Sequence, residues 1–142
     1  MKTTRSLITI CLLFAATALF AQTENRQLMK VNIPFAFGVE HHSLPAGQYT
    51  IFTVTPERSI RIVSADGMDS VIINTLPNYA RSPSSKSSLE FHKYGNRYFL
   101  AKVWTIGQSV ARNPMSSKKA MDLASSRGQL KTTTVIAFSI AR

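Results

Sequence analysis

Hydrophobic and polar residues alternate along much of the chain from residue 31 onward. In the stretch VNIPFAFGV (31–39), apolar side chains occupy every second position, with small or polar residues between them. This period of two is typical of a β-strand with one buried face. Pro34 has no backbone N–H to donate, so we expect this strand to lie at a sheet edge or to contain a bulge.

The next segment, LPAGQYTIFTV, predicts a tight turn and a returning strand. Pro45 and Gly47 stand at the second and fourth positions of LPAG, as in a type I turn. Residues 49–54 are rich in β-branched and aromatic side chains, which favour a strand. If Gly47 forms a strained corner of this hairpin, its replacement by valine is expected to lower the stability of the fold.

The alternation continues in two further strands, 60–63 and 71–76, which flank the strong turn pair Asp66 and Gly67. A serine-rich segment, 82–88, then predicts an exposed loop. A second hairpin follows within residues 89–106 and is expected to turn at Gly95 and Asn96.

The register of this second hairpin stays open, because a shift of one residue exchanges the two faces of a strand. A two-residue turn places Leu89 and Phe91 on the face of Tyr98, Leu100 and Trp104, whereas a three-residue loop places them with Phe99, Ala101 and Val103. In either register, both faces of residues 98–106 carry apolar or aromatic side chains, so we expect both to be covered.

One helix is predicted before the last strand. Asn113 is expected to be its N-cap, Pro114 its first residue, and Gly128 the residue just beyond its end. The chain then alternates again over residues 134–140. Six to eight short antiparallel strands and one late helix predict a mainly β fold, either an antiparallel β-sandwich or a small β-barrel with one C-terminal helix before the last strand.

The first 21 residues have the order of charged and apolar residues that a secretory signal peptide requires. Lys2 and Arg5 precede an apolar run over residues 7–20, and Ala21 supplies a small residue at the expected cleavage point. The run is shorter than the roughly 20 residues that a membrane-spanning helix needs. We therefore expect residues 1–21 to be removed. The product is a single exported domain, 22–142, located in the periplasm or outside the cell and without a transmembrane segment.

Removal of this leader changes the composition in two ways. The only cysteine, Cys11, is lost, so the mature domain has no disulfide and no cysteine that could act as a metal ligand or nucleophile. The formal net charge of +10 loses Lys2 and Arg5 and becomes +8. A basic surface attracts anionic partners. In the cell envelope these partners are acidic glycans or lipid head groups, and export argues against nucleic acid.

The remaining candidate motifs do not form an enzyme or cofactor site. His41 and His42 are neighbours in an expected loop, and adjacent histidines rarely reach one metal ion together. The segment DGMD (66–69) lacks the other oxygen ligands of a calcium loop. The segment SSKK (116–119) has the serine and lysine spacing of acyl-transferring enzymes, but KTT at Lys131 departs from the Lys-Thr-Gly strand that they also need. We therefore expect no cofactor, no metal and no catalytic residue.

The second hairpin is the candidate binding surface, because aromatic and basic residues are interleaved along it. Such residues can stack on sugar rings and attract anions. The candidate residues are Tyr94, Tyr98, Trp104, Arg97 and Lys102, with His92 between them. The competing interpretation is that these rings pack beneath the predicted helix as part of the core.

Several blocks of the sequence resemble a family of small secreted β-rich proteins from environmental bacteria. These blocks are KVNIPFAFGV, LPAGQYTI, LEFHKYGNRYFLAKVW and an expected helix followed by a strand, and their order and spacing also match. The resemblance covers most of residues 22–142 and implies a secreted β-rich fold. The function of that family is uncharacterised, so the resemblance assigns no catalytic or binding residue.

The sequence favours a non-enzymatic exported β-domain with a binding or structural role at the cell envelope. The first alternative is a carrier of small apolar ligands, built as a closed β-barrel with an apolar interior. An enzyme of unknown class is the second alternative. A filled core with an exposed aromatic patch favours the binding domain, an apolar cavity favours the carrier, and a pocket that joins His92 or His41 to a carboxylate favours the enzyme.

Overall fold

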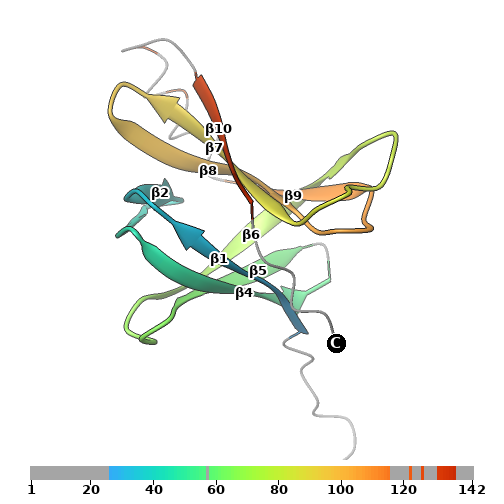
Figure 1. The fold of residues 1–142 in the computed structure, drawn as a ribbon, viewed down its shortest axis with the longest axis horizontal. Helices are drawn as coiled ribbons and strands as arrows, with labels where there is room; N and C mark the ends of the chain where they lie inside the picture. The colour runs from blue at the N-terminus through green and yellow to red at the C-terminus, as the bar shows by residue number, and fades with distance from the viewer. Residues whose placement is uncertain (1–25, 57, 116–121, 123–125, 127–130, 137–142) are drawn as a thin grey trace, which may run out of the picture.

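The computed structural model describes residues 26–56, 58–115, 122, 126 and 131–136. Ten β-strands make up most of this part of the chain (Figure 1). The first five are β1 (Arg26–Ile33), β2 (Phe37–Val39), β3 (His42–Leu44), β4 (Gly47–Thr55) and β5 (Ser59–Ser64). The second five are β6 (Ser70–Tyr79), β7 (Ser88–Tyr94), β8 (Arg97–Trp104), β9 (Val110–Pro114) and β10 (Lys131–Ile136).

The strands form two layers that share the long strand β6. Hydrogen-bonded neighbours follow the order β1-β4-β5-β6-β9-β8-β2-β3, while β7 pairs with β8 and β10 pairs with β7. Residues 70–74 of β6 pair with β5 and residues 75–79 pair with β9, so β6 crosses from one layer to the other (Figure 1). The described sheet is open, with β1 and β10 at edges. The predicted mainly β fold is confirmed, and the open sheet is consistent with a sandwich.

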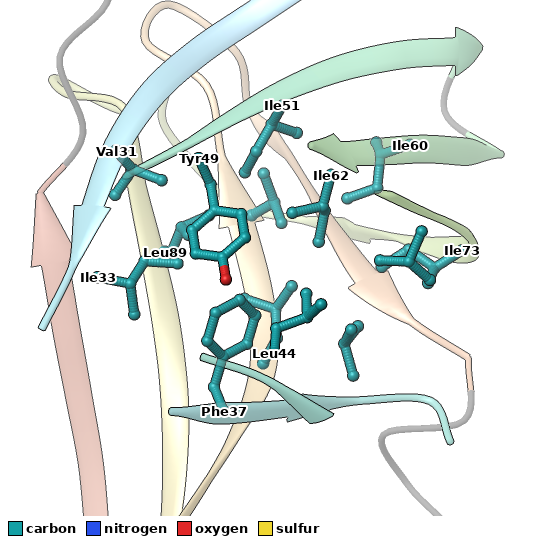
Figure 2. Packing of buried hydrophobic residues seen from close by; sticks show 14 of the residues in the cluster. Val31, Ile33, Phe37, Leu44, Tyr49, Ile51, Ile60, Ile62, Ile73 and Leu89 are labelled. Carbon is teal, nitrogen blue, oxygen red and sulfur yellow. The ribbon is translucent and has the colours of Figure 1, made fainter. Parts of the chain in front are cut away.

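Side chains from both layers meet in one core (Figure 2). Met29, Val31 and Ile33 alternate inward along β1. The ring of Phe37 on β2 packs edge-on against Tyr49 of β4, with ring centroids 5.4 Å apart. The other buried apolar side chains of this cluster are Val39, Leu44, Ile51, Ile60, Ile62, Val71, Ile73, Leu89, Phe91, Leu100 and Val103. Because apolar burial is the dominant favourable term in folding, this cluster joins the two layers.

The predicted strand 31–39 is divided into β1 and β2. β1 begins at Arg26 and ends at Ile33, immediately before Pro34. In the described part of the chain β1 pairs only with β4, so it is an edge strand, as Pro34 indicates. After residue 36 the chain enters the other layer, where β2 runs parallel to β8. This parallel pair makes the sheet mixed, whereas the sequence predicted antiparallel strands alone.

Glu40 and His41 form the turn between β2 and β3, in a segment that was predicted to be a loop. Glu40 has a φ of 51°, in the left-handed region that residues other than glycine seldom adopt. Its Oε1 atom accepts a 3.3 Å hydrogen bond from the backbone N–H of Asn74. Asn74 is the residue at which β6 changes its partner from β5 to β9. The carboxylate thus binds a backbone donor at the junction between the two layers.

The LPAG turn connects β3 to β4, and Gly47 is the first residue of β4. It lies opposite Ile33 in the β1–β4 ladder. Its φ is outside the left-handed region, and a Cβ added there would meet only the Tyr49 ring, at 3.9 Å. The expectation that Gly47 is a strained corner is therefore wrong.

The β7–β8 hairpin turns at Gly95 and Asn96, as predicted. The turn contains these two residues, because Tyr94 lies directly opposite Arg97. Gly95 adopts a φ of 56°, which glycine reaches at little cost. This part of the hairpin follows the two-residue register considered above.

A bulge changes the register in the middle of the same hairpin. Phe91 lies opposite Leu100, but Leu89 lies opposite Val103, which leaves Ala101 as an extra residue on β8. All of these side chains are buried. Each register considered from the sequence therefore holds for one half of the hairpin, and the bulge joins the two halves.

The predicted start of the C-terminal helix is wrong. Asn113 and Pro114 belong to β9 and lie opposite Leu76 and Thr75 of β6. A residue before proline favours an extended backbone both at a helix N-cap and in a strand, so the Asn-Pro pair does not separate the two structures. Most of the remaining predicted helix lies outside the described residues.

The last strand differs from the prediction, and the serine-rich loop forms as predicted except at its end, since Ser82, Pro83, Ser85 and Lys86 are exposed. β10 runs from Lys131 to Ile136 and pairs with β7, whereas the sequence placed the strand at 134–140; residues 137–140 lie outside the described part. In the serine-rich segment, Ser87 and Ser88 are buried rather than exposed. The Ser87 hydroxyl accepts a 3.1 Å hydrogen bond from the Ile106 backbone N–H, which docks this segment on the loop after β8.

Candidate functional site

The hairpin formed by β7 and β8 carries all five predicted binding residues, but on two different faces. Residues directly opposite each other in an antiparallel pair share a face. Lys93 lies opposite Tyr98, on the face that also carries buried Phe91. We call the other side the outer face. It consists of Ser88, Glu90, His92, Tyr94, Arg97, Phe99, Lys102 and Trp104.

Trp104 is held by Glu90 on the outer face. The indole Nε1 donates a 2.6 Å hydrogen bond to Glu90 Oε1. The second carboxylate oxygen, Oε2, lies 3.3 Å from the Lys102 ammonium. The same ammonium is 6.0 Å from the centroid of the Trp104 ring. One carboxylate therefore fixes a half-buried indole and a cation side by side.

A second cation and ring lie nearer the hairpin turn on the same face. The Arg97 guanidinium carbon is 5.9 Å from the centroid of the Phe99 ring. Arg97 is exposed and Phe99 is half-buried. Each arrangement places a positive charge within the distance at which a cation is attracted to an aromatic ring. The outer face thus has two cation–aromatic pairs, and sequence reasoning named only one ring of the two.

Tyr94 is not an accessible ligand-binding residue, although its position on the outer face fits the prediction. Its side chain is 7% exposed and packs against Phe99, with ring centroids 6.1 Å apart. Burial raises the pKa of the Tyr94 phenol, and the Asp122 carboxylate raises it further. Tyr94 is therefore a packed ring, whereas most of the helix that was expected to cover it lies outside the described residues.

Tyr98 lies on the opposite side of the hairpin from Trp104. Its ring stacks on Phe35 at a centroid distance of 3.8 Å and an interplanar angle of 13°. The Lys93 ammonium lies 5.0 Å from the centroid of the same ring. Sequence reasoning missed Phe35 and Lys93. Strand parity would have identified Lys93 if the turn length had been known, but no local signal connects Phe35 with Tyr98.

His92 lies on the outer face, opposite Phe99. Burial lowers the pKa of its imidazole, and the nearby Lys102 charge lowers it further, while Glu90 acts in the opposite direction. Its partner across the β7–β10 ladder is Thr132, which carries no charge. The His92 ring is therefore neutral near pH 7, and Lys102 and Arg97 carry the positive charge of this face.

The other two predicted motifs occur at turns. His41 and His42 are exposed in and beside the β2–β3 turn, far along the chain from His92. The Asp66 carboxylate accepts hydrogen bonds from the Ser64 hydroxyl and the Met68 backbone N–H, which lower its pKa. Among the described residues, no group of three or more histidine, cysteine or acidic side chains lies close enough to hold a metal ion.

Comparison with known proteins adds no relative. No family model matches the chain, and no match is found among curated proteins or solved structures. The family resemblance noted in the sequence therefore stays a prediction. In the part of the chain that the structure describes, no helix has the length and apolar character needed to span a bilayer.

Proposed function

We propose that this chain is a non-enzymatic, exported β-domain that binds an acidic glycan of the cell envelope through the outer face of β7 and β8. The observation that carries the proposal is the arrangement of Trp104 and Lys102 around Glu90. An indole can stack on the apolar face of a sugar ring. An ammonium beside it can attract the carboxylate or sulfate of the same sugar.

Preorganisation supports this assignment. Glu90 fixes the Trp104 ring before any ligand arrives, so less side-chain freedom is lost on binding. Glu90 also partly neutralises Lys102, which means that an anion competes with an internal carboxylate. The exposed Arg97 contributes a second positive charge on the same face. We therefore expect moderate affinity that increases with the number of acidic sugars in the ligand.

The proposed export is compatible with the described fold. β1 begins at Arg26, so cleavage after Ala21 leaves every described strand whole. The mature domain would retain a net charge of +8 from the +10 of the full chain, after loss of Lys2 and Arg5. This charge favours encounter with polyanions before specific contacts form.

An acidic glycan has more support than a lipid surface as the ligand. The half-buried Trp104 ring, held by Glu90 at the end of β8, suits a flat sugar better than an acyl chain, because insertion into a bilayer needs rings or aliphatic groups that project from the surface. The apolar-ligand carrier has less support, since the described sheet is open and the space between its layers contains packed side chains. An enzyme gains no support from His92, which lies opposite Phe99 and whose pKa is lowered by burial and by the Lys102 charge.

The proposal is tested on an array of neutral glycans, acidic glycans and anionic vesicles, probed at low and high salt. Wild type is compared with Trp104→Ala and with Tyr79→Ala, which removes an exposed ring from β6. At high salt, we expect wild type and Tyr79→Ala still to bind the acidic glycans. Trp104→Ala should no longer bind them. A glycan ligand would be contradicted if the anionic vesicles bound the protein as well as the acidic glycans did and if the Trp104→Ala substitution did not change the binding.

A further inference from the structure

Three side chains on adjacent strands form a row on the inner side of the β7–β8 hairpin. Lys131 of β10 lies directly opposite Lys93 of β7, and Lys93 lies directly opposite Tyr98 of β8. Directly opposite residues have Cβ atoms about 5 Å apart and share a face. We call this set the rim row. It lies near the hairpin turn, on the side of the hairpin that does not carry Trp104.

The two ammonium groups of the rim row are an unfavourable pair by themselves, because like charges directly opposite each other destabilise a sheet. Neither lysine pairs with a carboxylate in the part of the chain that the structure describes. The acidic residue of β7, Glu90, is on the outer face and already contacts Lys102 and Trp104. The rim row therefore carries positive charge that no carboxylate among the described residues offsets.

Tyr98 gives this charge a fixed geometry. Its ring is stacked on the Phe35 ring, with centroids 3.8 Å apart. The Phe35 ring in turn packs edge-on against the buried Phe91 ring, with centroids 5.1 Å apart. The Lys93 ammonium is 5.0 Å from the Tyr98 ring centroid, so the ring also attracts this cation. The Tyr98 hydroxyl has no hydrogen-bond partner among the described residues, and the side chain is half-buried. The rim row thus offers two ammonium groups and one hydroxyl as donors, with the Lys93 ammonium placed beside the stacked Tyr98 ring.

We propose that the rim row binds a phosphate group, such as that of a phosphate monoester. A phosphate dianion matches two positive charges, and lysine is a common point-charge ligand of phosphate. The tyrosine hydroxyl supplies a neutral hydrogen bond that distinguishes this site from simple charge attraction. The site is separate from the proposed glycan surface, because Trp104 lies on the other side of the hairpin. Its test is therefore independent of that proposal.

The first experiment measures the melting temperature of the full mature domain against inorganic phosphate at low ionic strength, with chloride as the matched salt. We expect phosphate to raise the melting temperature of wild type in a saturable manner, because a ligand that binds the folded state stabilises it. Lys93→Gln and Lys131→Gln are each expected to weaken phosphate binding about tenfold, as expected for loss of one charge-assisted hydrogen bond. Lys86→Gln removes an equal charge from an exposed loop and should leave the affinity within about twofold.

A second readout separates a lost site from a damaged fold. Without phosphate, Lys131→Gln should melt at a higher temperature than wild type, because it removes the like-charge pair. Tyr98→Phe keeps the stack on Phe35 and should still weaken phosphate binding. Trp104→Ala should leave the phosphate effect unchanged. The proposal would be overturned if phosphate did not raise the melting temperature, or raised it no more than chloride does. It would also be overturned if Lys86→Gln weakened phosphate binding as much as Lys93→Gln and Lys131→Gln do.

The source of the phosphate is distinguished by two further ligands. A soluble sugar phosphate and vesicles that contain phosphatidate present the same group with different accessibility. The inner position of the rim row predicts that the sugar phosphate competes with inorganic phosphate and that the vesicles do so weakly. Stronger competition by the vesicles would assign the site to a lipid, whereas competition by neither would contradict a phosphate-monoester site.

Discussion

The hydroxyl of Tyr49 donates a 2.7 Å hydrogen bond to the backbone carbonyl of Pro45, four residues earlier in the chain. The Tyr49 ring is buried and packs edge-on against Phe37, with centroids 5.4 Å apart (Figure 2). One side chain therefore ties the LPAG turn to the centre of the core. Burial raises the pKa of this phenol, so it remains a hydrogen-bond donor at neutral pH.

Replacement of Tyr49 by phenylalanine should lower the free energy of unfolding by about 1 kcal/mol, the typical contribution of one hydrogen bond. The ring and its packing are kept, so only the contact with Pro45 is lost. Equilibrium unfolding in urea measures the change. Tyr49→Leu, which also removes the ring, should cost more. Equal stability of Tyr49→Phe and wild type would mean that the hydroxyl does not support the turn.

Two glycines of the N-terminal half should respond oppositely to alanine. A Cβ on Gly38 would lie 2.9 Å from Cδ1 of the Phe99 ring, whereas a Cβ on Gly47 would meet only Tyr49 at 3.9 Å. Gly38→Ala should therefore destabilise the fold by about 1–3 kcal/mol, as overpacking does. Gly47→Ala should be neutral or stabilise by up to about 1 kcal/mol, because it restricts the unfolded chain.

The cause of the Gly38 effect can be isolated with a second substitution. Phe99→Leu removes the ring that the new Cβ would contact, so the double variant should recover part of the stability lost in Gly38→Ala. Thermal unfolding of the two single variants and the double variant measures this coupling. Strict additivity would show that the close approach between β2 and β8 does not limit position 38.

His92 should make stability depend on pH near neutrality. Its pKa is lowered in the folded state by burial and by Lys102. Below the ordinary histidine pKa of about 6.5, the unfolded state therefore binds more protons than the folded state. The unfolding free energy should fall as the pH decreases from about 7.5 to about 5. The change of unfolding free energy with pH should be smaller in His92→Gln than in wild type. It should be kept in His42→Gln, where His92 is intact. An unchanged slope in His92→Gln would contradict this origin.

The alternation of apolar and polar side chains predicted the strands well, because each strand turns one face toward the same core. The inward positions of β1, β4, β5 and β6 follow the period of two, and the turns at Gly67 and Gly95 use the positive φ that glycine permits. β9 was missed because its short segment, which includes Asn113 and Pro114, carries a helix-start signal. That signal depends on an extended residue before proline, and a strand satisfies the same condition.

The candidate site was only partly predictable, because one bulge decides which residues share a face. The extra residue Ala101 places Lys102 and Trp104 on the same side as Arg97, although a regular strand would separate Trp104 from Arg97. Tyr98 falls on the other side, and its partner Phe35 comes from a distant segment. Composition identified the hairpin, but register and long-range packing determine its surfaces.

Export is tested by expression of the full chain in a Gram-negative host. We expect the protein in the envelope or secreted fraction to begin near Gln22, because Ala21 is the expected cleavage point. N-terminal sequencing of that fraction measures the result. A chain that retains Met1 in the cytoplasm would remove the basis for an envelope ligand.

The most direct test of the proposed function is the dissociation constant of the mature domain for a soluble polyuronate in about 1 M salt, where the Debye length is about 3 Å. Wild type is measured beside Trp104→Ala and the control Tyr79→Ala, after their melting curves establish that all three are folded. We predict that wild type and Tyr79→Ala retain measurable binding and that Trp104→Ala binds at least about fivefold more weakly, as expected for the loss of one stacked ring. Binding that disappears with salt in all three proteins, or that is equal in all three, would contradict recognition of an acidic glycan by the outer face.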